Sequence, residues 1–105
     1  MAFKAAFIAH APDADPAIHN SVIDTGKYKL FTVVVRNQEQ ALEVSRRLVQ
    51  EEGVHSILLC PGHSHSNIAE IQAAVGANVS VSVARGDPAG TRIAMEVMGR
   101  EGWFR

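Results

Sequence analysis

The hydrophobic residues of this chain gather in four short runs, at residues 3–9, 28–36, 55–60 and 79–83. The runs at 28–36 and 55–60 are nearly continuous, a pattern typical of interior strands that are covered on both faces of a sheet. In the last run, Val79, Val81 and Val83 alternate with Ser80 and Ser82. That period of two predicts a half-buried strand at a sheet edge or against a partner.

Helical patterns separate these runs. Asn37 and Gln40 form a variant of the capping box, which predicts that a helix begins there and continues to about Glu52, with Gly53 as a left-handed C-cap. A second helix is expected over residues 67–75, and Asp87-Pro88 is expected to open a third as N-cap and first helical residue. The inner face of that third helix would consist of Ile93, Ala94, Val97 and Met98. Asp15-Pro16 also predicts a short helix over residues 17–23.

The order of these elements predicts one α/β domain spanning residues 1–105. We expect a small three-layer sandwich with a four-stranded, mostly parallel sheet joined by right-handed crossovers. A flavodoxin-like order, 2-1-3-4 in the numbering of the four predicted strands, is the leading topology. A ferredoxin-like α+β sheet with one antiparallel strand is the alternative, and periodicity does not separate the two.

Composition removes several classes of function. The 105 residues carry a net charge of -1 with no basic block, and the few aromatic residues are not interleaved with Lys or Arg, so no nucleic-acid partner is expected. No apolar stretch reaches the roughly 20 residues of a membrane span, so no membrane partner is expected either. The single cysteine rules out an intramolecular disulfide, and the first apolar stretch is shorter than a signal-peptide core. These features predict a cytoplasmic protein.

Candidate chemistry lies where the predicted strands end. His10 follows the first strand, Arg36 the second, residues 60–65 the third, and Arg85-Gly86-Asp87 the fourth. The carboxyl ends of parallel strands meet at one edge of an open α/β sheet, and ligands bind there. We therefore expect these groups to form a site.

The segment Cys60-Pro61-Gly62-His63-Ser64-His65-Ser66 is the densest in polar groups. Gly62 would allow a ligand to approach the backbone, and the helix N-terminus at Asn67 would favour an anion. His63 and His65 are suited to proton transfer or metal ligation near neutral pH. Ser64 or Ser66 is expected only to cap the helix.

A metal site is a further possibility for the same segment. His10, Cys60, His63 and His65 supply enough nitrogen and sulfur for a divalent transition metal such as zinc or copper. Their spacing matches no strong metal-binding signature, and no other cofactor is expected. Cys60 also continues the apolar Leu58-Leu59, which is typical of an inert, buried thiol.

The third group of candidates is charged. Arg85 would bind a carboxylate of a ligand or pair with Asp87. Asp87 would orient a histidine or act as a base, although capping a helix accounts for it equally well. Arg36 is a weaker ligand-binding candidate, because it directly precedes a capped helix.

Four segments carry a resemblance to a known family: residues 1–16, 28–31, 60–62 and 83–87. Together they resemble a family of small prokaryotic proteins of about this length, known only as a domain of unknown function. The similarity extends over essentially the whole chain. It implies a standalone single-domain protein, and it supplies no activity, substrate or catalytic residue. Within the family pattern His65 ranks above His63.

The leading functional hypothesis is an acid–base enzyme of the lyase or isomerase type that acts on an anionic small molecule. His10 and His65 would exchange protons, Arg85 and the helix N-terminus at Asn67 would hold the anion, and Asp87 would orient. Such an enzyme should keep His10 and His65 within about 7 Å of each other in a pocket.

Two hypotheses of other classes stay open: a ligand- or metal-binding module without turnover, and an assembly subunit. We also expect a homo-oligomer, a dimer or higher, formed through the strand at 79–83 and through Trp103 and Phe104.

Overall fold

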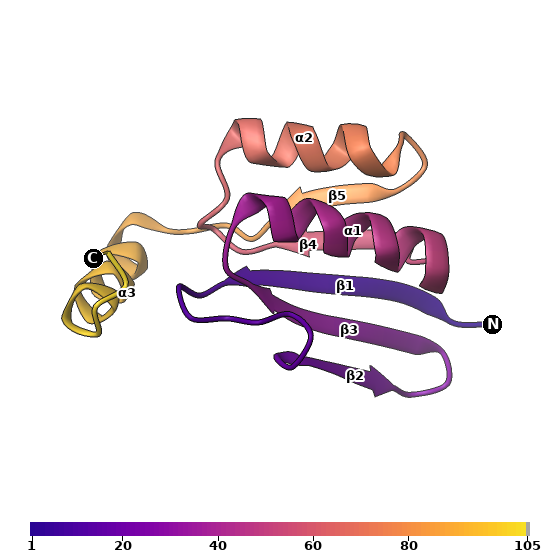
Figure 1. Cartoon of the computed structure of the whole chain (residues 1–105), viewed down its shortest axis with the longest axis horizontal. Helices are drawn as coiled ribbons and strands as arrows, with labels where there is room; N and C mark the ends of the chain where they lie inside the picture. The colour runs from indigo at the N-terminus through magenta and orange to yellow at the C-terminus, as the bar shows by residue number, and fades with distance from the viewer. Residues whose placement is uncertain (105) are drawn as a thin grey trace.

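The computed structural model of the protein describes residues 1–104, which form five strands and three helices (Figure 1). In chain order the elements are β1 (Phe3–His10), β2 (Asn20–Asp24), β3 (Tyr28–Val35), α1 (Gln38–Glu52), β4 (Ser56–Leu59), α2 (His65–Val75), β5 (Ser80–Val83) and α3 (Pro88–Arg100).

The strands form one sheet in the order β2-β3-β1-β4-β5. All neighbouring strands are parallel except β2, which runs antiparallel to β3 at the edge. Without β2, the order is the predicted flavodoxin-like one, so the α/β class and the mostly parallel sheet are confirmed. The strand count differs from the prediction by one.

The extra strand corrects the helix predicted over residues 17–23. The backbone carbonyl of Asp15 accepts hydrogen bonds from the amides of Ile18 and His19, but this turn does not continue as a helix. The chain instead enters β2, with Val22 opposite Phe31, and turns into β3 at Gly26, whose φ is +97°. The β-branched pair Val22-Ile23 and a turn with glycine in the left-handed region favour a hairpin over a single helical turn.

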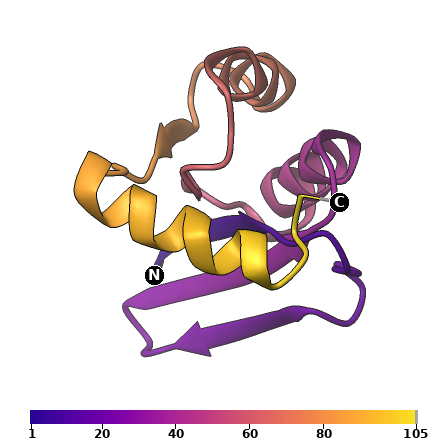
Figure 2. The ribbon, with the colours of Figure 1, turned by 90° about the vertical axis from the view of Figure 1, so that its left-hand side faces the viewer.

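One face of the sheet carries the hydrophobic core. Helices α1 and α2 lie side by side over this face, as Figures 1 and 2 show. The fully buried residues include Ile8 of β1, Ile57 and Leu59 of β4 and Ile71 of α2. Right-handed crossovers that advance in one direction along a sheet place their helices on the same side, which explains why α1 and α2 are neighbours.

The predicted third layer is absent from residues 1–104, which corrects the three-layer sandwich. Helix α3 lies beyond the carboxyl ends of the strands and crosses in front of them in Figure 2, away from the face opposite α1 and α2. None of its residues is buried. Of its predicted inner face, only Met98 is half-buried; Ile93, Ala94 and Val97 are exposed.

The helix ends follow the predicted capping chemistry in α1 and α2. The Asn37 side chain accepts a hydrogen bond from the amide of Gln40, and Gly53 closes α1 with a φ of +71°. Ser64 caps α2 by accepting from the amide of Asn67. The cap predicted for α3 is wrong in one respect, because Asp87 makes no side-chain capping bond although Pro88 is the first helical residue.

None of the helices in the described part of the chain is long and apolar enough to cross a membrane.

Candidate functional site

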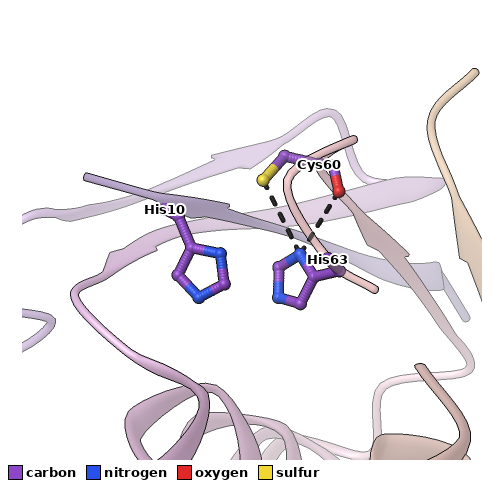
Figure 3. Close-up of side chains that lie close together, drawn as sticks. All are labelled: His10, Cys60 and His63. Carbon is purple, nitrogen blue, oxygen red and sulfur yellow. Dashed lines mark hydrogen bonds between the residues drawn. The ribbon is translucent and has the colours of Figure 1, made fainter. Parts of the chain in front are cut away.

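His10, Cys60 and His63 converge at the carboxyl ends of two neighbouring strands, β1 and β4 (Figure 3). His10 ends β1, and Cys60 directly follows β4, the parallel neighbour of β1. One ligand atom from each side chain lies within 4.8 Å of the other two. The two imidazole rings stack, with centroids 4.2 Å apart and planes inclined by 25°.

A tight turn after β4 brings His63 back toward the strand end. The amide of His63 donates a 3.2 Å hydrogen bond to the carbonyl of Cys60. Gly62, between them, leaves space beside the cluster: a Cβ built there would stand 3.6 Å from the Cys60 Sγ and 3.9 Å from the His10 Nδ1. Both distances are ordinary van der Waals contacts, so Gly62 lies directly beside two of the three side chains.

Both histidines are held toward the neutral form. Burial lowers the pKa of His10, and the nearby charge of His63 lowers it further. Burial also lowers the pKa of His63, which is only 6% exposed, although a hydrogen bond to the backbone of Cys60 opposes the shift. Neutral imidazole is the form that accepts a proton or binds a metal.

The surroundings of the His63 ring leave one nitrogen without a partner. Its Nδ1 lies 3.2 Å from the carbonyl oxygen and 3.6 Å from the Sγ of Cys60. The carbonyl favours a proton on Nδ1, which makes Nε2 a lone-pair acceptor. That buried Nε2 has no hydrogen-bond partner among residues 1–104. Buried polar atoms are normally paired, and this ring nitrogen has its lone pair available for a ligand.

The cluster has the donor set and approximate spacing of a transition-metal site. A tetrahedral zinc ion with bonds of about 2.0–2.3 Å requires ligand atoms roughly 3.3–3.6 Å apart. The ligand atoms of the three side chains lie within 4.8 Å of one another, so side-chain rotation would have to bring them about 1 Å closer to hold such an ion.

The other predicted residues of the third loop lie outside the cluster. His65 begins α2 and is exposed, and it is not one of the three residues that could share an ion. The amide of Asn67 is bonded to Ser64, and its carbonyl accepts from Gln38. The free amides expected at this helix N-terminus are therefore partly satisfied by the protein itself.

The charged candidates point elsewhere. Arg85 and Asp87 form a 2.7 Å ion pair with each other, with side chains 88% and 64% exposed. Arg36 donates to the carbonyl of Ala14 and so fastens the loop after β1. The structure thus brings together His10, Cys60 and His63, with Gly62 beside them. Arg36, Asn67, Arg85 and Asp87 form their hydrogen bonds with other groups, and His65 is exposed.

Two cavities lie in a region that the sequence did not single out. They have volumes of about 480 and 250 Å³, lie between α1 and the segment around β2, and share Pro16, Ala17 and Arg47 in their walls. None of the predicted site residues lines either cavity. The signal that would have indicated them is the hairpin at residues 20–35, which the predicted helix over 17–23 concealed.

Fold and cluster together define the class of the protein: a small α/β protein with a His/Cys cluster at the carboxyl end of a mostly parallel sheet. Residues 3–99 match a family described as "Family of unknown function (DUF6506)", and the chain belongs to that family. This confirms the resemblance to a domain of unknown function. No curated protein and no solved structure matched the chain.

Proposed function

We propose that this protein binds one divalent transition-metal ion, with zinc as the leading candidate, through His10, Cys60 and His63. The observation that carries the proposal is the convergence of two imidazoles and one thiol within 4.8 Å at the ends of adjacent strands. The lowered pKa values of both histidines support it, because protons compete with metal ions for the same lone pairs.

The donor set favours zinc or copper over the hard cations. Mg²⁺ and Ca²⁺ take oxygen ligands, and the cluster offers nitrogen and sulfur. Geometry does not separate zinc from copper here, since two histidines and a cysteine serve both metals. We place zinc first because Zn²⁺ has a single stable oxidation state and readily adopts tetrahedral sites with Cys and His ligands.

Three protein ligands leave one position open in a tetrahedral site, which is typical of zinc ions that act on a ligand. A bound ion would supply a positive charge that attracts an anionic small molecule, the ligand class expected from the sequence. The metal would then provide the attraction expected of Arg85, whose guanidinium is paired with Asp87.

Metal content and cobalt substitution test the proposal. Protein purified without chelator, or loaded after chelator treatment, should hold close to one ion per chain by plasma mass spectrometry. Loading with Co²⁺ should produce a near-ultraviolet sulfur-to-metal charge-transfer band. Cys60→Ser should abolish that band, and His10→Asn and His63→Asn should weaken binding by about 10-fold or more.

His65→Asn is the matched control, because it removes an exposed imidazole from the same loop outside the cluster. It should leave binding unchanged. The proposal fails if the folded wild-type protein takes up no ion, or if Cys60→Ser binds as tightly as wild type.

A second candidate is an acid–base enzyme that uses His10 and His63. The stacked ring pair and the lowered pKa values of both residues favour this assignment over the pair His10 and His65 expected from the sequence. Such an enzyme would turn over an anionic substrate. Its activity should persist in the presence of chelator and in the Cys60→Ser variant, and it should be lost in the His63→Asn variant. Activity lost on chelation would instead support the metal centre.

A further inference from the structure

The face of the sheet opposite α1 and α2 is uncovered; its apolar side chains gather on β1 and β3, and serines occupy it at β5. Strand alternation places on it one charge-free set of side chains, from the four parallel strands together with Ser21 and Ile23 of β2. Its large apolar members are Phe3, Phe7, Ile23, Tyr28, Leu30 and Leu58, each exposed or half-buried. Parallel strands normally have both faces covered, so this surface, which we call the open face, lacks a layer.

Helix α3 carries the complementary feature. Ile93, Ala94, Val97 and Met98 recur at helical spacing and form an apolar stripe, while Arg92 and Glu96 lie on the other side. Ile93 is 59% exposed and Val97 42%. Exposed Trp103 and Phe104 follow the helix. The apolar stripe of α3 and the open face thus both expose side chains that normally pack against another element.

The molecule as a whole exposes more surface than a compact chain of its size. Its accessible surface is 6768 Å², whereas a folded monomer of this mass exposes about 5,700 Å². Its radius of gyration is 14.1 Å, against about 13 Å for a compact domain of 105 residues. The excess of roughly 1,000 Å² per chain amounts to about 2,000 Å² for two chains, the upper end of a standard stable interface.

The start of α3 is held at the end of the sheet. Gly86, in the linker after β5, is packed so closely that a Cβ there would lie 3.1 Å from the Thr91 Oγ1 and 3.4 Å from the Pro61 Cβ. Arg85 and Asp87, on either side of Gly86, form an exposed ion pair with each other within this linker. From this anchor α3 runs across the carboxyl ends of the strands, off the open face of its own chain (Figures 1 and 2).

We propose that two copies of this chain form a symmetric dimer by arm exchange, in which the apolar stripe of α3 from each copy covers the open face of the other. The anchored linker directs α3 away from its own sheet, and the excess surface matches what such a dimer would bury. A reciprocal exchange is isologous, so it closes at two copies. This interface differs from the one expected from the sequence, because it uses the broad face of the sheet and leaves the edge at β5 free. It still includes Trp103 and Phe104, as expected.

Light scattering on a size-exclusion column, at several concentrations of the full chain, tests the proposal. Wild type should elute with the mass of a dimer. Ile93→Glu in the stripe and Leu58→Glu on the open face should each raise the dimer dissociation constant at least about 10-fold. Met95→Glu is the matched control: Met95 is 47% exposed on the same helix but lies outside the stripe, and its substitution should leave the dimer intact.

Mixing the two disruptive variants separates exchange from other arrangements. Ile93→Glu retains an intact open face and Leu58→Glu an intact α3, so an equimolar mixture should form a heterodimer with one sound interface. Circular dichroism of each variant confirms that it is folded.

Three results would overturn the proposal: a wild-type monomer at every concentration, which would leave α3 free or place it on its own sheet; a dimer indifferent to Ile93→Glu; or a mixture that stays monomeric.

Discussion

The two faces of the sheet are made by the same strands yet differ in what covers them. On the face beneath α1 and α2, Ile57 and Leu59 are 0% exposed, whereas Leu58, between them on the opposite face, is 38% exposed. All three residues belong to one apolar run. The difference shows that α1 and α2 cover only one side of a strand whose apolar run would fit a cover on both.

The largest expected effect is a difference in stability between two substitutions in β4, one on each face of the sheet. Leu59→Ala should lower the free energy of unfolding by about 2–5 kcal/mol, because it leaves a cavity in the buried core. Leu58→Ala removes the same atoms from the open face and should cost about 1 kcal/mol or less in the monomer. Urea denaturation of both variants at low protein concentration measures the difference.

Equal losses in the two variants would mean that the open face is already covered within one chain. A cost for Leu58→Ala that grows with protein concentration would support arm exchange.

A smaller effect is expected at the N-termini of two helices, α1 on the covered face of the sheet and α3 beyond the strand ends. Asn37→Ala removes the side-chain acceptor for the Gln40 amide and should cost about 1 kcal/mol of stability. Asp87→Ala removes no capping bond from α3, only an exposed ion pair with Arg85, and should cost no more than about 0.5 kcal/mol. Thermal denaturation of both variants at one pH provides the test. An Asp87→Ala variant as destabilised as Asn37→Ala would contradict the structure of the α3 N-terminus.

The smallest expected effect is the pH dependence of stability that arises from His10 and His63, at the carboxyl ends of β1 and β4. The pKa values of His10 and His63 are lowered in the folded state, chiefly by burial, so the unfolded chain binds more protons as the pH falls below about 6.5. Stability of the metal-free protein should therefore decline as the pH falls from 6.5 toward the folded-state pKa values. Chemical denaturation at pH 7.5 and 5.5, with chelator present, measures the decline.

The double variant His10→Asn/His63→Asn is the comparison for this pH series. It should lose most of the decline between pH 7.5 and 5.5. A double variant with the same slope as wild type would assign the dependence to other groups.

Local chemistry made most of the elements predictable. The nearly continuous runs of β3 and β4, the cap at Asn37 and the left-handed Gly53 each depend on residues within a few positions of one another, and each is present in the structure. The segment around β2 was not predictable in this way. Five residues fit either a helical turn or a short strand, and pairing with β3 settles the choice.

The candidate site was predictable in part for the same reason. Polar residues that follow apolar strands marked the correct edge of the sheet. Their assembly depended on strand neighbours: β1 lies beside β4, which brings His10 to Cys60 and His63, while the chain after the edge strand β5 carries Arg85 and Asp87 outward into solvent.

The sequence by itself determined the α/β class, most helix ends and the set of candidate side chains, because propensity, periodicity and capping act over short distances. Only the tertiary structure decided which candidates meet, which face of the sheet is covered and where α3 lies. Those outcomes depend on contacts between residues far apart in the chain, whose spacing in space is fixed only when the strands pair.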